Sequence, residues 1–473
     1  MPERRIRCTK LVATIGPACR ELEIIRELIR AGMNVARLNL SHADHAEHAE
    51  LAARVRKAAA EEHTPVALMA DTRGSEIRTG ELEGGRAELA VGAAFTLRSD
   101  GAIGDAQGVS ITDPYLEADL SAGAAVFLDD GRIELRVERV VPGAIACRVV
   151  RGGVLGDRKG LNAPGAKRGP SALGPDDLED LRFAAELGVD YVAASFVRGA
   201  EDVAAIRTIL GEHGAHIPVI AKIENRDAVG RLHEILEVAD GTMVARGDLG
   251  VELPLERVPI VQKQIIRATV RSGKPAITAT QMLDSMERNP RPTRAEVSDV
   301  ANAIFDGTSA IMLSGETATG RYPVESVATM ARLALEAEGA LHEYGDLQQA
   351  RPSTEPSITE GVAQAATTLA QELEASAILT LTESGTTSRA ISKHRPPCPI
   401  LAVTTRPELV RRLALNWGVT GLLFEDSAGD EEKVAFGIER ARALCSEPGD
   451  VVVVTAGISQ ETGSTNLVRV VTV

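Results

Sequence analysis

Charged residues follow short apolar runs at several places in this sequence. Lys222 and Glu224 come directly after the apolar run 219–221, and Asp248 follows the run 243–245. Such runs alternate with helix-length amphipathic segments, which predicts parallel strands joined by helices. The carboxyl ends of parallel barrel strands share one opening. The lysine and the two carboxylates are therefore expected to face a common site.

These residue types suit phosphoryl transfer assisted by a divalent cation. Mg²⁺ takes oxygen ligands, commonly one or two carboxylates together with substrate oxygens, and Glu224 and Asp248 offer such a pair. In this chemistry the protein positions the reactants and neutralises charge rather than supplying a covalent nucleophile. The turn at 247–250 would open a short helix whose amides receive an anion. The basic side chains available for phosphates are Arg37, Arg78, Lys159 and Lys222.

Eight apolar runs, each followed by room for a helix, predict a closed (β/α)8 barrel. Residues 75–169 interrupt it with a Gly-rich, non-helical stretch that predicts an all-β insertion, including a hairpin over 126–137 that turns at Asp130–Gly131. After a Pro-containing linker at 351–357, strands and helices alternate again and predict a separate α/β domain. The expected barrel strands are 11–14, 35–38, 66–70, 191–194, 219–221, 243–245, 276–279 and 310–313. The expected domains are 1–74 and 170–345 for the barrel, 75–169 for the insertion and 346–473 for the C-terminal domain.

Composition limits the class of protein. The chain has 473 residues, of which 44% are hydrophobic and 25% charged, as expected of roughly three globular domains. No apolar run approaches the roughly 20 residues of a membrane span, and no apolar leader follows the basic start, so neither a membrane protein nor a secreted one is expected. The net charge of −15 argues against nucleic acid as the main partner. Five scattered cysteines without a CxxC pair predict a cytoplasmic protein with no disulfides.

Eight motifs occur in order along the chain: TKLVATIGP at 9–17, NVARLN at 34–39, EIRTG at 76–80, AKIEN at 221–225, MVARGDLGVE at 243–252, ITATQML at 277–283, RPTRAEV at 291–297 and MLSGET at 312–317. In order and spacing they resemble the pyruvate kinase family. The resemblance implies a TIM barrel with a mobile β lid inserted after strand three and a C-terminal α/β regulatory domain, usually in a homotetramer. It also implies transfer of the phosphoryl group of phosphoenolpyruvate to ADP, giving pyruvate and ATP in the last step of glycolysis.

Matching positions carry the family's roles to this chain. Glu224 and Asp248 are similar to the ligands of Mg²⁺ or Mn²⁺. Lys222 resembles the residue that stabilises the transferring phosphoryl group, and Arg37 and Thr280 are also expected to be catalytic. The substrate contacts would be Arg37, Lys222, Gly247, Asp248 and Thr280. The K⁺ ligands would be Asn39, Ser41, Asp71 and Thr72. The nucleotide contacts would be Asn39, His42, Arg78 and Lys159.

The chain departs from the family pattern around the lid. Ser75 stands where the family usually has proline, and Arg73 replaces a common lysine; both positions belong to the hinge, so both would alter lid motion. Leu161 and Ala163 are less usual in the lid-closing motif at 159–165. Glu76 is the family's mark of K⁺ dependence, since lysine at that position supplies the charge internally.

Structural interpretations stand beside these roles. Lys222 and Glu224 would also fit a barrel-interior ion pair. Asp71 would also fit a turn cap, Thr280 a local backbone bond, and Asn39 with Ser41 a turn. The histidines at 42, 45 and 48 look metal-like, but steps of three residues drift by about 60° each around a helix, so the rings converge poorly. Asp44 is expected to cap the helix that follows, with Glu47 completing a capping box.

Two other functions use the same features. One is a barrel carbon–carbon lyase that acts on a pyruvate enolate with a divalent metal, which gives no reason for Arg78 and Lys159. The other is an inactive sensor of sugar phosphates that uses the C-terminal domain alone, which gives no reason for an intact set of Lys222, Glu224 and Asp248.

The C-terminal domain carries a hydroxyl-rich loop at 382–388 and a closing loop at 462–466 that resembles the family's effector loop. The first loop holds Glu383, and no Lys or Arg lies between Ala456 and Leu467. Amides and hydroxyls can hold one phosphate, but a second phosphate beside Glu383 would be repelled. The expected effector is therefore a monophosphate, such as AMP or a hexose or pentose monophosphate, rather than fructose 1,6-bisphosphate.

Overall fold

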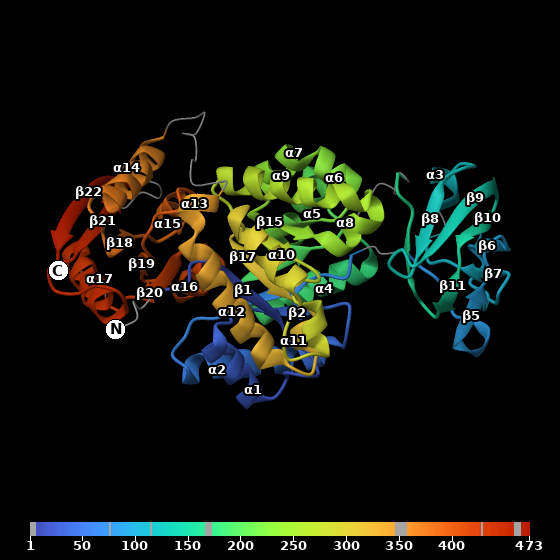
Figure 1. Ribbon diagram of the computed structural model, residues 1–473, viewed down its shortest axis with the longest axis horizontal. Helices are drawn as coiled ribbons and strands as arrows, with labels where there is room; N and C mark the ends of the chain where they lie inside the picture. Colours follow the sequence, from blue (N-terminus) through green and yellow to red (C-terminus); the bar gives the residue numbers. More distant parts are fainter. Residues whose placement is uncertain are drawn as a thin grey trace.

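A closed barrel of eight parallel strands forms the centre of the computed structural model (Figure 1). The prediction of eight barrel strands is confirmed, and β14 extends through Lys222 to Ile223. The structure describes residues 6–74, 77–113, 116–165, 173–345, 357–426, 429–457 and 465–473. In order around the barrel the strands are β1 Lys10–Thr14, β2 Val35–Asn39, β3 Ala67–Asp71, β13 Tyr191–Ala194, β14 Val219–Ile223, β15 Gly241–Ala245, β16 Ala276–Ala279 and β17 Ala310–Leu313.

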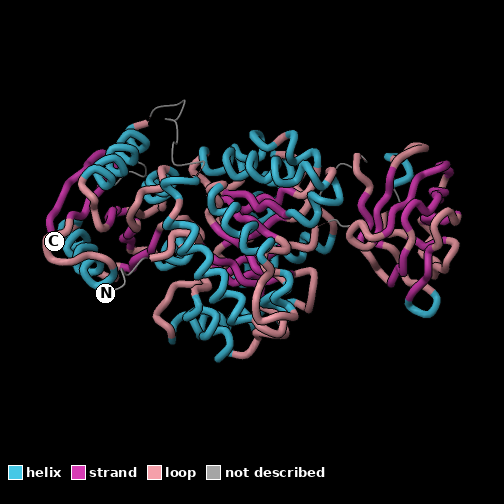
Figure 2. The backbone as a smooth tube through the Cα atoms, viewed as in Figure 1, coloured by secondary structure: helices cyan, strands magenta, loops and turns pink. Residues whose placement is uncertain are grey.

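Helices surround the barrel on all sides (Figure 2). They present aliphatic stripes to the strands; α1, for example, buries Ile25, Leu28 and Ile29. Asp44 caps α2 as predicted, since its Oδ1 accepts the Glu47 N–H at 2.8 Å. The helices are α1 Leu22–Ala31, α2 His45–Glu61, α4 Pro175–Leu187, α5 Ala200–Glu212, α6 Arg226–Gly230, α7 Leu232–Val238, α8 Arg246–Glu252, α9 Val258–Arg271, α10 Arg294–Phe305, α11 Gly315–Ala318, α12 Pro323–Gly339 and α13 Leu341–Tyr344, with 3₁₀ turns η2 Leu255–Arg257 and η3 Asp284–Glu287.

The insertion after β3 is all-β apart from two short helical turns, as predicted, and lies to one side of the barrel (Figure 1). Its main sheet has the order β4-β12-β8-β9-β10-β6-β7, and β5 pairs with β11. The elements are β4 Ile77–Arg78, η1 Glu83–Gly85, β5 Arg86–Leu89, β6 Ala94–Arg98, β7 Gly108–Ser110, α3 Leu116–Asp119, β8 Ala125–Leu128, β9 Ile133–Val141, β10 Ala144–Arg151, β11 Gly153–Gly156 and β12 Gly160–Asn162.

The predicted hairpin forms, but its turn is longer than the sequence indicated. The strands pair up to Leu128 and Ile133, so the turn spans 129–132 rather than two residues. Asp129 leaves the ladder because its N–H donates to the Gly160 carbonyl at 3.0 Å and its carboxylate pairs with Lys159 at 3.0 Å. Asp129, Asp130 and Gly131 all have positive φ values.

The C-terminal α/β domain has a five-stranded sheet of order β20-β19-β18-β21-β22, in which only β22 is antiparallel. Ala414 and Leu415 of this domain join the core inside the barrel, at the amino-terminal end of its strands. The domain's elements are α14 Ile358–Glu372, β18 Ala377–Leu381, α15 Thr386–Lys393, β19 Ile400–Thr404, α16 Pro407–Leu413, β20 Val419–Leu423, α17 Asp430–Leu444, β21 Val451–Gly457 and β22 Thr465–Thr472.

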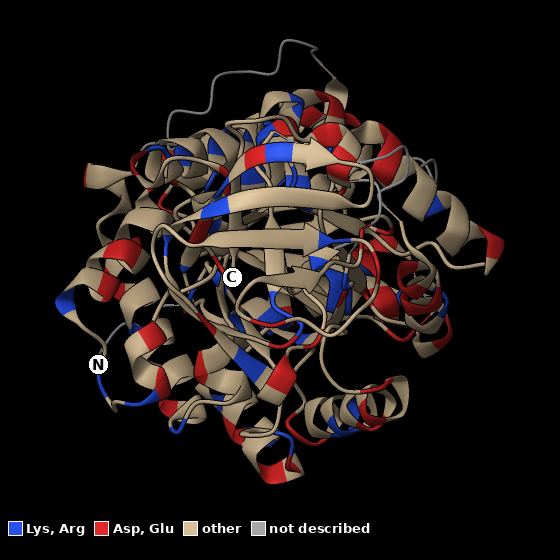
Figure 3. Cartoon of the chain, turned by 90° about the vertical axis from the view of Figure 1, so that its right-hand side faces the viewer, with Lys and Arg blue, Asp and Glu red and all other residues tan. Residues whose placement is uncertain are grey.

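Acidic and basic residues are interspersed along the outer helices (Figure 3). Within the described part of the chain, none of the helices combines the length and the apolar character needed to span a bilayer. The five cysteines are all unpaired thiols.

Candidate active site

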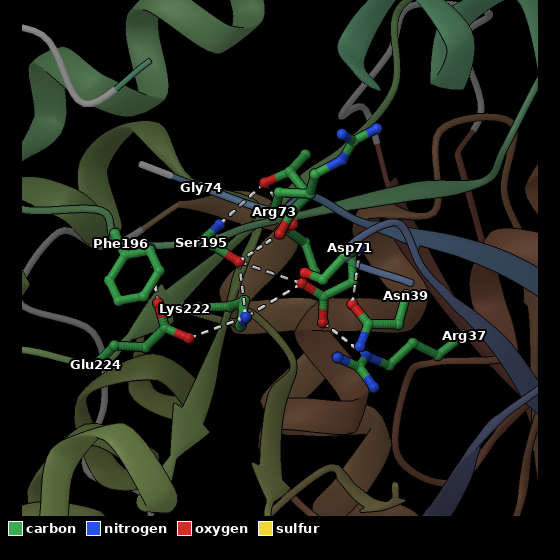
Figure 4. Close-up of polar contacts among 12 residues, drawn as sticks. Arg37, Asn39, Asp71, Arg73, Gly74, Ser195, Phe196, Lys222 and Glu224 are labelled. Carbon is green, nitrogen blue, oxygen red and sulfur yellow. Dashed lines mark hydrogen bonds and ion pairs between the residues drawn. The ribbon is translucent and has the colours of Figure 1, made fainter. Parts of the chain in front are cut away.

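Lys222 lies at the carboxyl-terminal end of the barrel, where β14 meets the loops that follow β3 and β13 (Figure 4). Its Nζ lies 2.7 Å from Ser195 Oγ, 2.9 Å from Glu224 Oε1 and 3.1 Å from Asp71 Oδ1. The side chain is 12% exposed, whereas the two carboxylates are 1% exposed. The ammonium is therefore fixed by three partners, and only a small part of the side chain is exposed.

Asp71 binds two cations at once. Its Oδ1 faces Lys222, and its Oδ2 accepts the Arg37 Nε–H at 2.6 Å. Arg37 also donates to Thr14 Oγ1 at 3.0 Å. Burial alone would raise the pKa of the Asp71 carboxyl, but Arg37 and Lys222 hold that pKa below its usual value. Asp71 is thus an anion that keeps both basic side chains at the end of the barrel.

The pKa of Lys222 is raised in the same cluster. Burial by itself would lower the pKa, but the charges of Asp71 and Glu224 outweigh it, and Asp248 adds to the effect. The contribution of Asp248, which lies in the first turn of α8, puts its carboxylate within electrostatic reach of Lys222. The structural alternative, an ion pair of Lys222 with Glu224, is therefore present as part of a larger cluster.

Glu224 combines features of a metal ligand and of a structural anchor. Its Oε1 faces Lys222, and its Oε2 accepts the Phe196 N–H at 2.6 Å. Phe196 has φ 54°, a conformation that a bulky residue rarely adopts, and this bond holds it there. A second carboxylate, that of Asp248, is close enough to Lys222 to raise its pKa. Two carboxylates beside an open barrel end suit a hard divalent cation.

The loops after β15 and β16 bring Thr280 and Gly247 together. Thr280 has φ 74°, a strained value for a β-branched residue. Arg246 supports this conformation, since its Nη2 donates to the Thr280 carbonyl at 2.6 Å and its Nε to the Ala279 carbonyl at 3.1 Å. A Cβ at Gly247 would lie 2.9 Å from Thr280 Cγ2. Only glycine lets α8 begin this close to Thr280.

Comparison with known proteins agrees with the family resemblance of the sequence motifs. Residues 6–327 match the family model "Pyruvate kinase, barrel domain", and residues 360–471 match "Pyruvate kinase, alpha/beta domain". The chain belongs to the pyruvate kinase family. Its relatives include the pyruvate kinase of Geobacillus stearothermophilus, 48% identical over 98% of this chain and 80% of that protein. The pyruvate kinase of Clostridium acetobutylicum is 44% identical over 98% of both chains.

The residues expected to bind K⁺ lie on two neighbouring loops of the barrel. Asn39 and Asp71 are register partners at the ends of β2 and β3. Asn39 Oδ1 accepts the Ser41 N–H at 3.3 Å, and the Thr72 carbonyl accepts the Ser195 hydroxyl at 2.7 Å. These oxygens are therefore close neighbours of the Lys222 cluster. Ser75, which departs from the family pattern, and Glu76, which is expected to indicate K⁺ dependence, both lie outside the described residues.

Arg78 and Lys159 lie next to each other on the inserted β domain. Arg78 pairs in register with Gly160, which follows Lys159. Arg78 Nη1 donates to the Arg158 carbonyl at 3.2 Å, and Lys159 Nζ pairs with Asp129. Both expected nucleotide contacts thus belong to the insertion, whereas the Lys222 cluster belongs to the barrel.

The histidines at 42, 45 and 48 have different surroundings. His42 lies in the exposed turn after β2, and its carbonyl accepts a bond from the His48 ring at 2.6 Å. The His45 ring lies 2.9 Å from the Asp180 carboxylate. Asp180 also pairs with Arg73 at 3.0 Å, at the entry to the insertion. In the described chain no group of three or more acidic, histidine or cysteine side chains is arranged to hold a metal ion.

Sequence reasoning missed Ser195 and Arg246. Ser195 follows β13, one of the strand ends that the sequence analysis did not search for chemistry, and the position after a barrel strand was the signal available. The sequence singled out Arg246 only as a member of the motif at 243–252 and gave it no role of its own. Its role depends on carbonyls of a left-handed loop, which no residue pattern indicates.

The Asp71 cluster predicts a specific pH dependence of stability. A carboxyl whose pKa is lowered on folding stabilises the protein above its unfolded pKa of about 3.9, and this contribution disappears as pH falls through the lower folded value. We expect Asp71→Asn to cost about 3 kcal/mol at neutral pH, because buried Arg37 loses its counter-charge and Lys222 loses one of its two carboxylate partners. The difference between parent and variant should shrink below about pH 4, because Asp71 then takes up a proton in the unfolded parent before it does so in the folded one.

Thermal melting from pH 8 to pH 3 measures this difference. Asp100→Asn is the control, since the Asp100 side chain is 51% exposed in its pair with Arg98 and should change little at any pH. A gap between the parent and Asp71→Asn that stays constant down to pH 3 would contradict the assignment.

Proposed function

We propose that this phosphotransferase moves the phosphoryl group of phosphoenolpyruvate to ADP, and that the cluster around Lys222 is where transfer occurs. The observation that carries the proposal is the Lys222 ammonium, held by Asp71, Glu224 and Ser195 at the carboxyl-terminal end of a barrel of this family. The lyase alternative gives no role to the basic pair on the insertion. The sensor alternative gives none to the Lys222 cluster.

In this function Arg37 and Lys222 bind the phosphoryl oxygens of the substrate. Both cations are already oriented by Asp71, so little reorganisation is needed when charge develops on those oxygens. Charge stabilisation by preorganised groups is the main contribution a protein makes to phosphoryl transfer. Ser195, Asp71 and Glu224 face the three N–H donors of the ammonium, so Lys222 would exchange one of these contacts for a phosphoryl oxygen.

Glu224 and Asp248 would hold the divalent cation, Mg²⁺ or Mn²⁺. When bound, such a cation neutralises charge on phosphate and enolate oxygens. Glu224 is prepared for this role because the Phe196 N–H and the Lys222 ammonium hold its carboxylate in place. Gly247 and Thr280 complete the substrate site, with Arg246 as a positioning residue that holds the Thr280 backbone.

The nucleotide would bind between the barrel and the insertion. Arg78 and Lys159 on the insertion offer charge for the ADP phosphates, with Asn39 and His42 on the barrel side. Since these residues are divided between two domains, the insertion acts as a lid whose closure completes the site. Lys159 would exchange its pair with Asp129 for a phosphate.

Replacing Lys222 tests the central role. Lys222→Met should lower turnover by roughly 10²–10³ or more, the scale for losing one positioned electrostatic group, with a smaller effect on substrate affinity. Steady-state kinetics with phosphoenolpyruvate, ADP, Mg²⁺ and K⁺ measure this, together with a melting curve. Lys57→Met is the control, because that side chain is 64% exposed on α2. A folded Lys222→Met enzyme whose turnover is within a few-fold of the parent's would contradict the assignment.

We also propose that K⁺ binds at Asn39, Ser41, Asp71 and Thr72 and activates the enzyme. Glu76 adds negative charge near Asp71 in the sequence, which a bound K⁺ would offset. We expect strong activation by K⁺ over tetramethylammonium at equal ionic strength, and a weaker response in Glu76→Lys. Glu83→Lys, a charge change elsewhere on the insertion, serves as the control. Equal rates of the parent in the two salts would refute this proposal.

A phosphorylated effector is proposed for the loop at 382–388. Thr387 Oγ1 lies 2.5 Å from Thr465 Oγ1, which joins this loop to the described end of the closing loop; residues 462–464 lie outside the described residues. The structure changes one premise of the sequence argument. The Glu383 carboxylate accepts bonds from Thr405 and pairs with Lys433 at 3.2 Å, so it does not repel a phosphate as an isolated charge would.

The preference for a monophosphate then rests on the lack of basic residues between Ala456 and Leu467. We expect AMP or a hexose or pentose monophosphate to lower the half-saturation for phosphoenolpyruvate more than fructose 1,6-bisphosphate does. Titration of each effector at sub-saturating phosphoenolpyruvate measures this. Thr387→Val should weaken the response, whereas Thr368→Val, at an exposed position of α14, should not. Stronger activation by the bisphosphate would reverse the conclusion.

A further inference from the structure

Gly74 and Gly174 lie on either side of the inserted β domain in the chain, and both are bonded to the same side chain. That side chain is Asp177, in the first turn of α4. Its Oδ1 accepts the Gly74 N–H at 2.7 Å, and its Oδ2 accepts the Gly174 N–H at 2.9 Å. One carboxylate therefore ties the chain that enters the insertion and the chain that leaves it to one helix.

Helix capping accounts for only one of these two bonds. The bond to Gly174 belongs to a capping box, in which the third residue of a helix accepts the N–H of the N-cap residue. The bond to Gly74 reaches 103 residues back in the chain and caps no helix. Asp177 is 1% exposed, and burial raises the pKa of its carboxyl. A cap can be made at the surface, so the burial of this carboxylate points to its second partner.

A second carboxylate of α4 holds the residue before Gly74. Asp180 is fully buried and accepts two bonds from Arg73, one from the backbone N–H at 3.3 Å and one from Nη2 at 3.0 Å. The His45 ring lies 2.9 Å from the same carboxylate and stacks on Phe183 at 4.3 Å, so α2 and α4 are joined at this point. The backbone of residues 73 and 74 is therefore fixed where the insertion begins.

Gly74 lies against the residues that hold the Lys222 cluster (Figure 4). It has φ 72°, and a Cβ at this position would lie 2.5 Å from a ring carbon of Phe196 and 2.8 Å from Ser195 Cβ. Phe196 donates its N–H to Glu224 at 2.6 Å, and the Ser195 hydroxyl accepts from Lys222 at 2.7 Å. The contact is so close that only glycine fits between the start of the insertion and these two residues.

We propose that Asp177 is a positioning residue that links the inserted domain to the Lys222 cluster. It fixes Gly74 as the pivot of the insertion, and Gly74 in turn fixes Phe196 and Ser195. A movement of the insertion about this pivot then reaches the cluster through direct contacts. The consequence for catalysis rests on the proposed phosphoryl transfer, whereas the link itself does not.

Replacing Asp177 by asparagine tests the link. The amide keeps one acceptor oxygen and turns its NH₂ group toward the other N–H, so one of the two chain connections is released. We expect faster amide hydrogen exchange at Gly74 and also at Phe196. Turnover should fall about tenfold or more, with a smaller change in the half-saturation for phosphoenolpyruvate. Asp176→Asn is the matched control, because it removes the same charge from the same helical turn at a side chain that is 74% exposed.

A second variant acts on the other side of the link. Gly74→Ala leaves Asp177 in place but brings a methyl group against Phe196 and Ser195, so exchange at Phe196 should rise in this variant as well. Gly92→Ala is its control, since Gly92 has a similar φ of 80° within the insertion and a Cβ there meets nothing within 4 Å. Melting curves establish that each variant is folded.

The exchange rate of the Phe196 amide decides the outcome. A rate equal to the parent's in folded Asp177→Asn and Gly74→Ala proteins would overturn the inference, as would an equal acceleration in the two controls. Parent-like turnover in an Asp177→Asn enzyme would show that Asp177 does not position the cluster for catalysis. Hydrogen exchange needs no turnover, so it decides the link even if the parent transfers no phosphoryl group, a result that would refute the proposed function instead.

Discussion

The Asp71 carboxylate lies between the guanidinium of Arg37 and the ammonium of Lys222, with one oxygen facing each. The two cations repel each other, and the charge of Arg37 by itself lowers the pKa of Lys222. The shared carboxylate offsets that repulsion and fixes both directions. Because the cluster is buried, removing the anion would leave Arg37 without an ion-pair partner among the described residues and Lys222 with Glu224 alone. The rest of the barrel end is arranged around this constraint.

The barrel provides the rigidity that such a cluster needs. Its strands are held in register, so Asn39 and Asp71 are fixed as neighbours by the pairing of β2 with β3. The opposite end is filled by Ala414 and Leu415 of the C-terminal domain. Tyr191 continues that contact, since its hydroxyl donates to the Arg412 carbonyl at 2.6 Å. The same strand, β13, leads on to Ser195 beside Lys222, so one strand connects the contact with the C-terminal domain to the cluster.

The elements that the sequence predicted well are those fixed by local pattern. Apolar runs placed all eight barrel strands, and motif residues such as Lys222 and Glu224 lie together as expected. The parts it did not predict depend on distant partners. The long turn at 129–132 follows from the contact of Asp129 with Lys159, and the charge of Glu383 in the loop 382–388 is balanced by Lys433, fifty residues further along the chain. No periodicity or motif reports such pairs.

Arg246 is another residue whose role depends on partners that are distant in the sequence. Its guanidinium donates to the carbonyls of Ala279 and Thr280 and pairs with Asp299 at 2.6 Å. A left-handed conformation at a β-branched residue costs of order 1–3 kcal/mol, and it persists only where several bonds oppose relaxation. Gly247 removes the Cβ that would otherwise meet the Thr280 methyl group. The strained backbone of Thr280 is therefore held by the hydrogen bonds from Arg246, and the missing Cβ at Gly247 leaves room for it. Together these contacts keep Thr280 in a conformation that its own backbone preference disfavours.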